Sequence, residues 1–262
     1  MSTSAAAPGL LDSAIRRDRI IVAAGLAGLT LLAWLYVIRL SRLMSPHSVM
    51  AMPMPGDIGV PELGYLIPMW IVMMVAMMVP SAAPTILLFA NIARSRKARG
   101  VPSVSAAVFT SGYLLVWAVY ATIAALLQSE LHRLALLSPS MASASPWLGG
   151  GLLILAGIYQ VLPAKGACLS HCHSPFGVFS HEWREGVGGA LIMGIRHGSY
   201  CVGCCWALMA LLFVAGVMNL VWVAAIAIFV LVEKLSPGGR AIGRLSGILL
   251  MAWGVWVVAA AV

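Results

Sequence analysis

Residues 63–90 read LGYLIPMWIVMMVAMMVPSAAPTILLFA, a run that contains no charged side chain. About 20 apolar residues are enough for a helix to cross the roughly 30 Å of bilayer hydrocarbon. A buried helix of a soluble core is usually shorter than this run. The run therefore predicts a membrane-spanning helix, and it sets the fold class for the rest of the chain.

Six further apolar runs are expected to cross the bilayer, at residues 20–38, 104–127, 147–161, 187–215, 217–232 and 242–262. The run at 147–161 is short, and the run at 187–215 is long enough to be a broken helix. The composition agrees, because 61% of the 262 residues are hydrophobic and only 9% are charged, against roughly 25% charged in a soluble domain. The predicted fold is an all-α, polytopic transmembrane helix bundle of about seven spans, forming one domain over residues 20–262.

Basic residues predict the orientation of this bundle. With the N-terminus inside, twelve lysines and arginines fall on the cytoplasmic side and only Arg39, Arg42 and Arg133 fall outside. Lys and Arg are enriched in cytoplasmic loops. We therefore expect residues 1–19 to form a disordered cytoplasmic N-terminal tail and the C-terminus to lie outside. Because the charges lie between apolar runs, the net charge of +8 does not indicate nucleic-acid binding.

The run at 187–215 contains four candidate metal ligands: His197, Cys201, Cys204 and Cys205. At 100° per residue they share an arc of about 100° on one helix face. Imidazole and thiolate suit Cu(I) or Zn(II), and no carboxylate joins them to favour a harder cation. Two alternatives stay open: the cysteines pack as small apolar residues, or the C-x-x-C spacing serves thiol-redox chemistry. The G-x-x-x-G spacing at 194–198 predicts close approach of another helix.

A second candidate site lies in the predicted cytoplasmic loop that follows residue 161. It contains Cys168, His171, Cys172 and His173. Two thiols and two imidazoles match the ligand count of a closed zinc or copper site. An ordinary polar loop is the alternative. A cytosolic location would keep these thiols reduced.

Methionines form a third candidate set on the run at 63–90. Met73 and Met77 lie on one i, i+4 row, and thioethers bind Cu(I) but not hard cations. Packing at a helix interface is the alternative reading of these residues. Pro80 and Pro84 are expected to kink this helix. A weaker set of soft ligands falls in the predicted outer loop: Met44, His47, Met50, Met52 and Met54.

Four stretches of the chain, at 69–84, 168–175, 196–206 and 218–234, resemble a bacterial family of uncharacterised integral membrane proteins predicted to bind metal. The most specific element is His197-Gly followed by Cys201-x-x-Cys204-Cys205-Trp. The resemblance extends from about residue 64 to residue 262. It implies a bacterial cell (inner) membrane location and a metal site, but it implies no reaction and no catalytic residue.

Together these features predict a membrane protein that binds a soft metal, first of all Cu(I), for transport, storage or delivery. Zinc is the alternative metal, and haem held through His197 is a further one. The expected partners are the lipid bilayer, the metal ion, and a membrane protein or metallochaperone. An enzymatic role is not expected. Two other functions remain: a structural or assembly subunit of a larger membrane complex, and a thiol-redox or electron-transfer protein.

Overall fold

The computed structural model describes residues 8–43, 60–100, 104–138, 141–174, 179 and 183–261. Over these residues the chain is helical, with one isolated β-bridge between Leu137 and Ser143. This confirms the all-α prediction. The outer-loop set at 44–54 lies outside the described residues. The helices are α1 (Pro8–Leu43), α3 (Val60–Ala98), α4 (Ala106–Arg133), α5 (Pro146–Val161), α6 (Pro163–His173), α8 (Gly186–Ala210), α9 (Leu212–Ala215), α10 (Leu220–Leu235) and α11 (Gly239–Ala259).

Each of the seven predicted apolar runs coincides with a helix, but the helices differ in length. Five segments are long and apolar enough to cross a membrane: Arg19–Leu43, Leu63–Ala98, Ala106–Arg133, Gly186–Ala215 and Gly239–Ala259. Helices α5 and α6 meet at an angle of 64° and make a sixth crossing if they form one broken span. Helix α10 has only 16 residues. The count of seven spans therefore stays a prediction.

The sequence indicated that the helix at 187–215 could be broken, but the structure shows the break after a different run. The run at 187–215 continues as helix to Ala210, and only a short turn separates α8 from α9. The break instead follows the run at 147–161, where Pro163 begins α6. Proline suits the first turn of a helix because the N–H it lacks has no intrahelical acceptor there. At the N-terminus, α1 begins at Pro8, within the segment that the sequence assigned to a tail.

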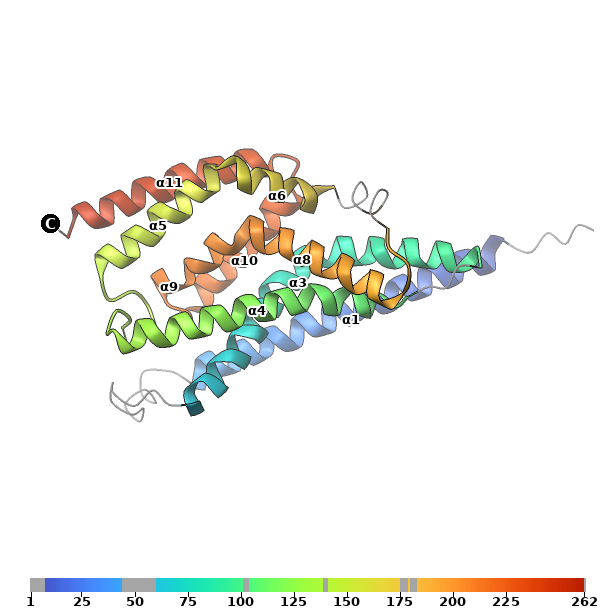
Figure 1. Cartoon of the computed structure of the whole chain (residues 1–262), viewed down its shortest axis with the longest axis horizontal. Helices are drawn as coiled ribbons and strands as arrows, with labels where there is room; N and C mark the ends of the chain where they lie inside the picture. Colours follow the sequence, from blue (N-terminus) through green and yellow to red (C-terminus); the bar gives the residue numbers. More distant parts are fainter. Residues whose placement is uncertain are drawn as a thin grey trace, which may run out of the picture.

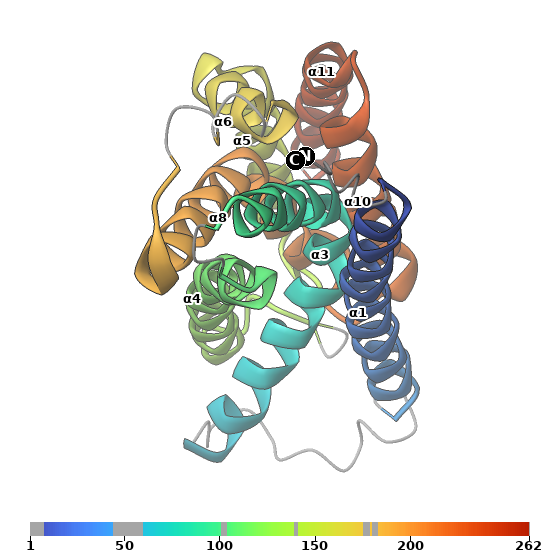
Figure 2. The same ribbon diagram turned by 90° about the vertical axis from the view of Figure 1, so that its right-hand side faces the viewer.

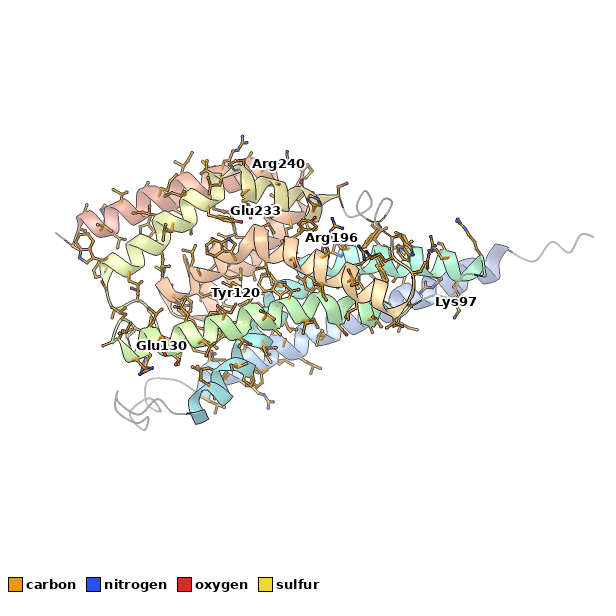
Figure 3. All side chains as sticks on the ribbon, viewed as in Figure 1. Lys97, Tyr120, Glu130, Arg196, Glu233 and Arg240 are labelled. Carbon is orange, nitrogen blue, oxygen red and sulfur yellow. The ribbon has the colours of Figure 1, made fainter. Side chains whose placement is uncertain are left out.

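The helices form an elongated bundle in which successive spans run in alternating directions (Figure 1). The C-terminus lies at the opposite end from the start of α1 (Figure 1). Charged residues mark the two ends, with Lys97 and Glu130 far apart along the long axis (Figure 3). Viewed along that axis, α3 and α8 lie near the centre of the bundle (Figure 2). The apolar segments of these two helices are 56% buried, against 17% for those of α1 and α11.

Helix α3 changes direction along its length (Figures 1 and 2). It contains Pro68, Pro80 and Pro84. A proline inside a helix lacks a backbone donor and clashes with the preceding turn, which bends the helix. The bend confirms the predicted kink. Helix α3 contacts α1, α4 and α10.

Helices α4 and α8 approach each other closely at two glycines. A Cβ atom on Gly194 would overlap the backbone carbonyl of Phe109, and one on Gly198 would lie 3.0 Å from Cβ of Val116. The close approach predicted from the G-x-x-x-G spacing is therefore confirmed, with α4 as the partner helix. The approach brings Tyr113 of α4 to the cysteines of α8.

Replacing Gly194 with alanine is expected to lower the free energy of unfolding by about 1–3 kcal/mol, because the added methyl group overpacks the contact. Denaturant or thermal unfolding of the purified protein in detergent measures this loss. The matched control is Gly188→Ala in the same helix, where a Cβ atom meets nothing within 4 Å. Because alanine favours helix more than glycine does, the control is expected to be neutral or slightly stabilising. Equal stability of the two variants would contradict the packing.

Candidate metal centre

The three cysteines of α8 point into the bundle. Cys201, Cys204 and Cys205 are 1%, 2% and 1% exposed, whereas the next residue, Trp206, is 43% exposed. This burial confirms that the thiols share one face of the helix. The fourth residue of the predicted set, His197, lies against the ring of Tyr113, with 5.7 Å between the ring centroids. Its assignment as a ligand stays a prediction.

The second candidate site does not lie in a loop. Residues 163–173 form helix α6, which packs against α8. The Sγ atoms of Cys172 and Cys204 are 3.9 Å apart. Cys168 lies beside Gly203, where an added Cβ atom would come within 2.9 Å of its Sγ. The two sites that the sequence separated therefore adjoin across the α6–α8 contact.

The two histidines of α6 are directed to other groups. The ring of His171 stacks on Tyr200 at 4.1 Å between centroids, and its Nδ1 is 2.9 Å from the carbonyl oxygen of Ala167. Nε2 of His173 is 2.9 Å from the carbonyl oxygen of Glu233. The structure therefore does not bring these two imidazoles together with Cys168 and Cys172. Their role as ligands stays a prediction.

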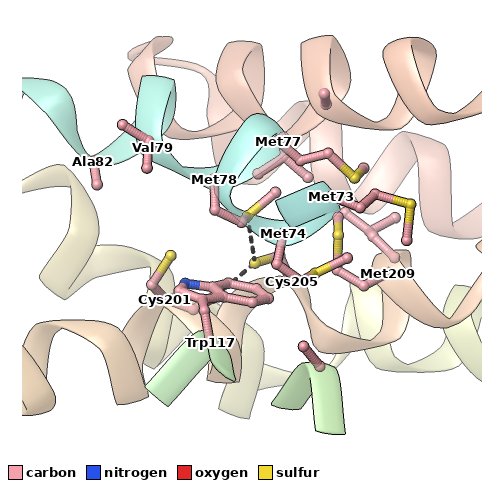
Figure 4. Close-up of a cluster of buried hydrophobic side chains, with 14 of the residues drawn as sticks. Met73, Met74, Met77, Met78, Val79, Ala82, Trp117, Cys201, Cys205 and Met209 are labelled. Atoms are coloured by element: carbon pink, nitrogen blue, oxygen red, sulfur yellow. Dashed lines mark hydrogen bonds between the residues drawn. The ribbon is translucent and has the colours of Figure 1, made fainter. Parts of the chain in front are cut away.

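A thioether reaches the same region from α3. Sγ of Cys205 lies 3.9 Å from Sδ of Met78 and 2.7 Å from the carbonyl oxygen of Cys201 (Figure 4). Met73 and Met77 are also buried in this apolar cluster, but the thioether that contacts the Cys205 thiol is that of Met78. The sequence pattern alone did not single out Met78, which lies with Met74 on a second i, i+4 row of the helix, next to the row of Met73 and Met77. We call Cys172, Cys201, Cys204, Cys205 and Met78 the sulfur cluster.

Two polar groups that the sequence did not assign contact this cluster. Nζ of Lys234 donates a hydrogen bond to Sγ of Cys201 at 2.8 Å, and Oη of Tyr113 lies 3.1 Å from the same sulfur. Oη of Tyr113 also donates to the carbonyl oxygen of Met78. Lys234 is one of the twelve basic residues that the charge pattern assigns to the cytoplasmic side, but the structure shows it as the buried penultimate residue of α10. Its position directly after a long apolar run is the sequence feature that could have indicated a buried lysine.

The sulfur contacts occur in pairs. Within the described residues, no group of three or more Cys, His, Asp or Glu side chains is placed to hold a metal ion. The close pairs are Cys172 with Cys204, and Cys205 with Met78. All five cysteines are free thiols. Thiolate and thioether pairs are donors that select soft cations such as Cu(I).

A buried ion pair lies beside the sulfur cluster. Lys165 of α6 pairs with Glu233 of α10, and each side chain is 2% exposed. Nζ of Lys165 also donates to Gln160, whose Nε2 donates to Oγ of Ser246 at 3.0 Å. Figure 3 shows Glu233 inside the bundle. The pair lines a small cavity together with Arg240 and Arg244. It ties α6 to α10, the two helices that bring Cys172 and Lys234 to the cysteines of α8.

Comparison with known protein families gives a match over most of the chain. A family model described as "PpoB2: Copper chaperone" matches residues 67–257. The matched segment contains every candidate ligand named above from α3, α6 and α8. Neither the curated proteins nor the solved structures include a significant match. The match agrees with the predicted metal-binding family, and its description names copper.

Proposed function

Because the chain belongs to the PpoB2 copper chaperone family, we propose that it binds Cu(I) through the sulfur cluster and delivers it from a bacterial inner membrane. The family supports copper binding or delivery in general. The five long apolar helices are compatible with a multi-pass membrane protein. The oxidation state of the metal, its ligands and the orientation of the chain in the membrane are parts of the proposal.

The observation that carries the proposal is the contact between the thiols of Cys172 and Cys204 across two helices. A thiol pair supplied by separate helices is open to a small closing motion around a metal ion. Cys205, the residue after Cys204, continues the sulfur cluster to Met78 of α3. Sulfur therefore extends from α6, through α8, to α3. An ion moving between neighbouring pairs would exchange one soft ligand at a time.

Cu(I) suits this arrangement better than Zn(II) does. Structural zinc sites use four nitrogen or sulfur ligands in a closed tetrahedron, and the described residues bring no such group together. Thiolates and thioethers without a carboxylate are the ligands that select Cu(I).

The order of the ligands favours delivery over storage. With the N-terminus inside, α6 lies on the cytoplasmic side and α3 runs from the outer side inward. The thiols then lie nearer the cytoplasm, and Met73 and Met77 continue toward the outer end of α3. Passage of an ion requires sites that bind well enough to capture it and weakly enough to release it. Thioethers carry no charge, and so give the weaker, releasing end of such a path.

Anaerobic loading of the reduced, detergent-purified chain with Cu(I) tests this proposal. After removal of unbound copper, elemental analysis is expected to find copper in proportion to protein. Loading with Zn(II) under the same conditions is expected to leave less metal bound. A protein that emerges free of copper would contradict the proposal.

Thiol-redox chemistry is the second candidate function, and it rests on the same pair of thiols. The Sγ atoms of Cys172 and Cys204 are 3.9 Å apart, and a disulfide requires about 2.05 Å. A modest approach of α6 to α8 would therefore allow a disulfide to form when an oxidant accepts the two electrons and two protons. Protein that binds no copper, but forms and releases this disulfide reversibly with a thiol or quinone partner, would favour this candidate.

A further inference from the structure

The ammonium group of Lys234 lies within the sulfur cluster. Its Nζ donates to Sγ of Cys201 at 2.8 Å and lies 3.3 Å from Oγ of Ser81. The side chain is buried. The adjacent carboxylate, Glu233, is engaged by Lys165. Among the described residues, no ion pair joins Lys234 to a carboxylate, so its nearest partner able to carry a negative charge is the Cys201 sulfur.

The position of this ammonium is fixed from three helices. Ser81 follows Pro80 of α3, and Cys201 lies just past the middle of α8. Lys234 itself comes from α10, two residues before Ser236 caps that helix. On the other side of Cys201, Oη of Tyr113 lies 3.1 Å from the sulfur. A cation held in this way cannot leave the site without the movement of α10.

We propose that Lys234 sets the charge of the metal ion that the site accepts, and so selects a monovalent over a divalent soft cation. This inference rests on the proposed Cu(I) site. Two thiols that bind Cu(I) release two protons and give a complex with one negative charge. The Lys234 ammonium then brings the site to neutrality. The same two thiolates with Zn(II) give a neutral complex, and the ammonium leaves the buried site with one uncompensated positive charge.

The size of this discrimination follows from the low polarity of the surroundings. Two unit charges a few ångströms apart interact several times more strongly in a protein than in water. A buried charge without a partner is costly, so a complex that supplies the missing negative charge is stabilised. The fixed ammonium therefore favours Cu(I), because it stabilises the anionic copper complex and gives no such stabilisation to the neutral zinc complex.

The test compares three variants of the full chain in detergent, Lys234→Leu, Lys234→Gln and Lys234→Arg, at one pH. Chelator competition measures the affinity of each protein for Cu(I) under anaerobic conditions and, separately, for Zn(II). The ratio of the two affinities is expected to fall by at least about tenfold in the leucine and glutamine variants. The arginine variant keeps the charge and is expected to keep the ratio within about threefold.

The glutamine variant separates charge from hydrogen bonding, because its amide still donates to sulfur. If the leucine variant fails to fold, the glutamine variant still shows how loss of the positive charge changes the ratio of the two affinities. A ratio that is the same in the glutamine variant and the wild-type protein would overturn the role of Lys234 and leave the copper site intact. Wild-type protein that binds no Cu(I) would overturn the proposed function as well, so the two failures are distinguishable.

Discussion

Replacing Cys204 with serine is expected to lower the affinity for Cu(I) by about 10–100-fold or more, since loss of a ligand costs at least as much as the 10–100-fold typical of outer-shell changes. Cys204 is the thiol that faces the second helix, through its contact with Cys172. A hydroxyl group is a harder ligand than a thiolate and does not replace it for a soft cation. Chelator competition on the anaerobically loaded protein measures the loss.

The control for this substitution is Cys168→Ser, the same exchange at the edge of the site. Cys168 is only half-buried and lies beside the backbone of Gly203. Its replacement is expected to change the affinity less than that of Cys204. Thermal unfolding of both variants shows whether the fold is kept. Equal losses in the two variants would mean that Cys168 takes part in binding as much as Cys204 does, and would contradict the proposed sulfur cluster.

Replacing Glu233 with glutamine is expected to lower the free energy of unfolding by about 3–5 kcal/mol, because it leaves the buried ammonium of Lys165 without its partner. Both side chains of this pair are 2% exposed. Denaturant unfolding in detergent measures the loss. The double variant Lys165→Met with Glu233→Leu removes both charges and is expected to recover most of the stability, since apolar residues of similar size replace buried ion pairs well.

The chain offers a matched exposed pair as the control. Arg96 and Glu185 also form an ion pair, but their side chains are 35% and 55% exposed. Glu185→Gln is expected to cost only about 0–1 kcal/mol, since water and salt screen exposed charges. A loss at Glu233 no larger than the loss at Glu185 would mean that water reaches the buried pair, and would contradict its role in joining α6 to α10.

The parts of the fold that were predictable from sequence are those that depend on local periodicity. A helix repeats every 3.6 residues, so the spacing of Cys201, Cys204 and Cys205 is enough to place them on one face. The G-x-x-x-G spacing at 194–198 likewise predicted a close helix contact, which α4 makes. Apolar length alone located the helices that coincide with the seven predicted runs. It did not establish the number of spans, because α10 is short and α5 and α6 are bent.

Which residues meet in the candidate metal centre was less predictable, because this depends on how the helices cross. The polar residues at 163–173 gave no apolar stripe, so helix α6 and its contact with α8 were missed. The kink in α3 decides which methionine row faces α8, and Met78 rather than Met73 or Met77 contacts a thiol. Lys234 reaches Cys201 only because α10 ends beside α8. None of these relations has a periodic signature in a single sequence.

Copper X-ray absorption spectroscopy of the Cu(I)-loaded full chain tests the central claim most directly, because it reports the atoms bound to the metal. The proposed site predicts a first shell of sulfur alone, with a spectrum typical of Cu(I) at low coordination number. It also predicts that the Cys204→Ser variant, loaded in the same way, holds less copper and has fewer sulfur atoms bound to it. A first shell made of nitrogen or oxygen, or a sulfur shell unchanged in that variant, would contradict it.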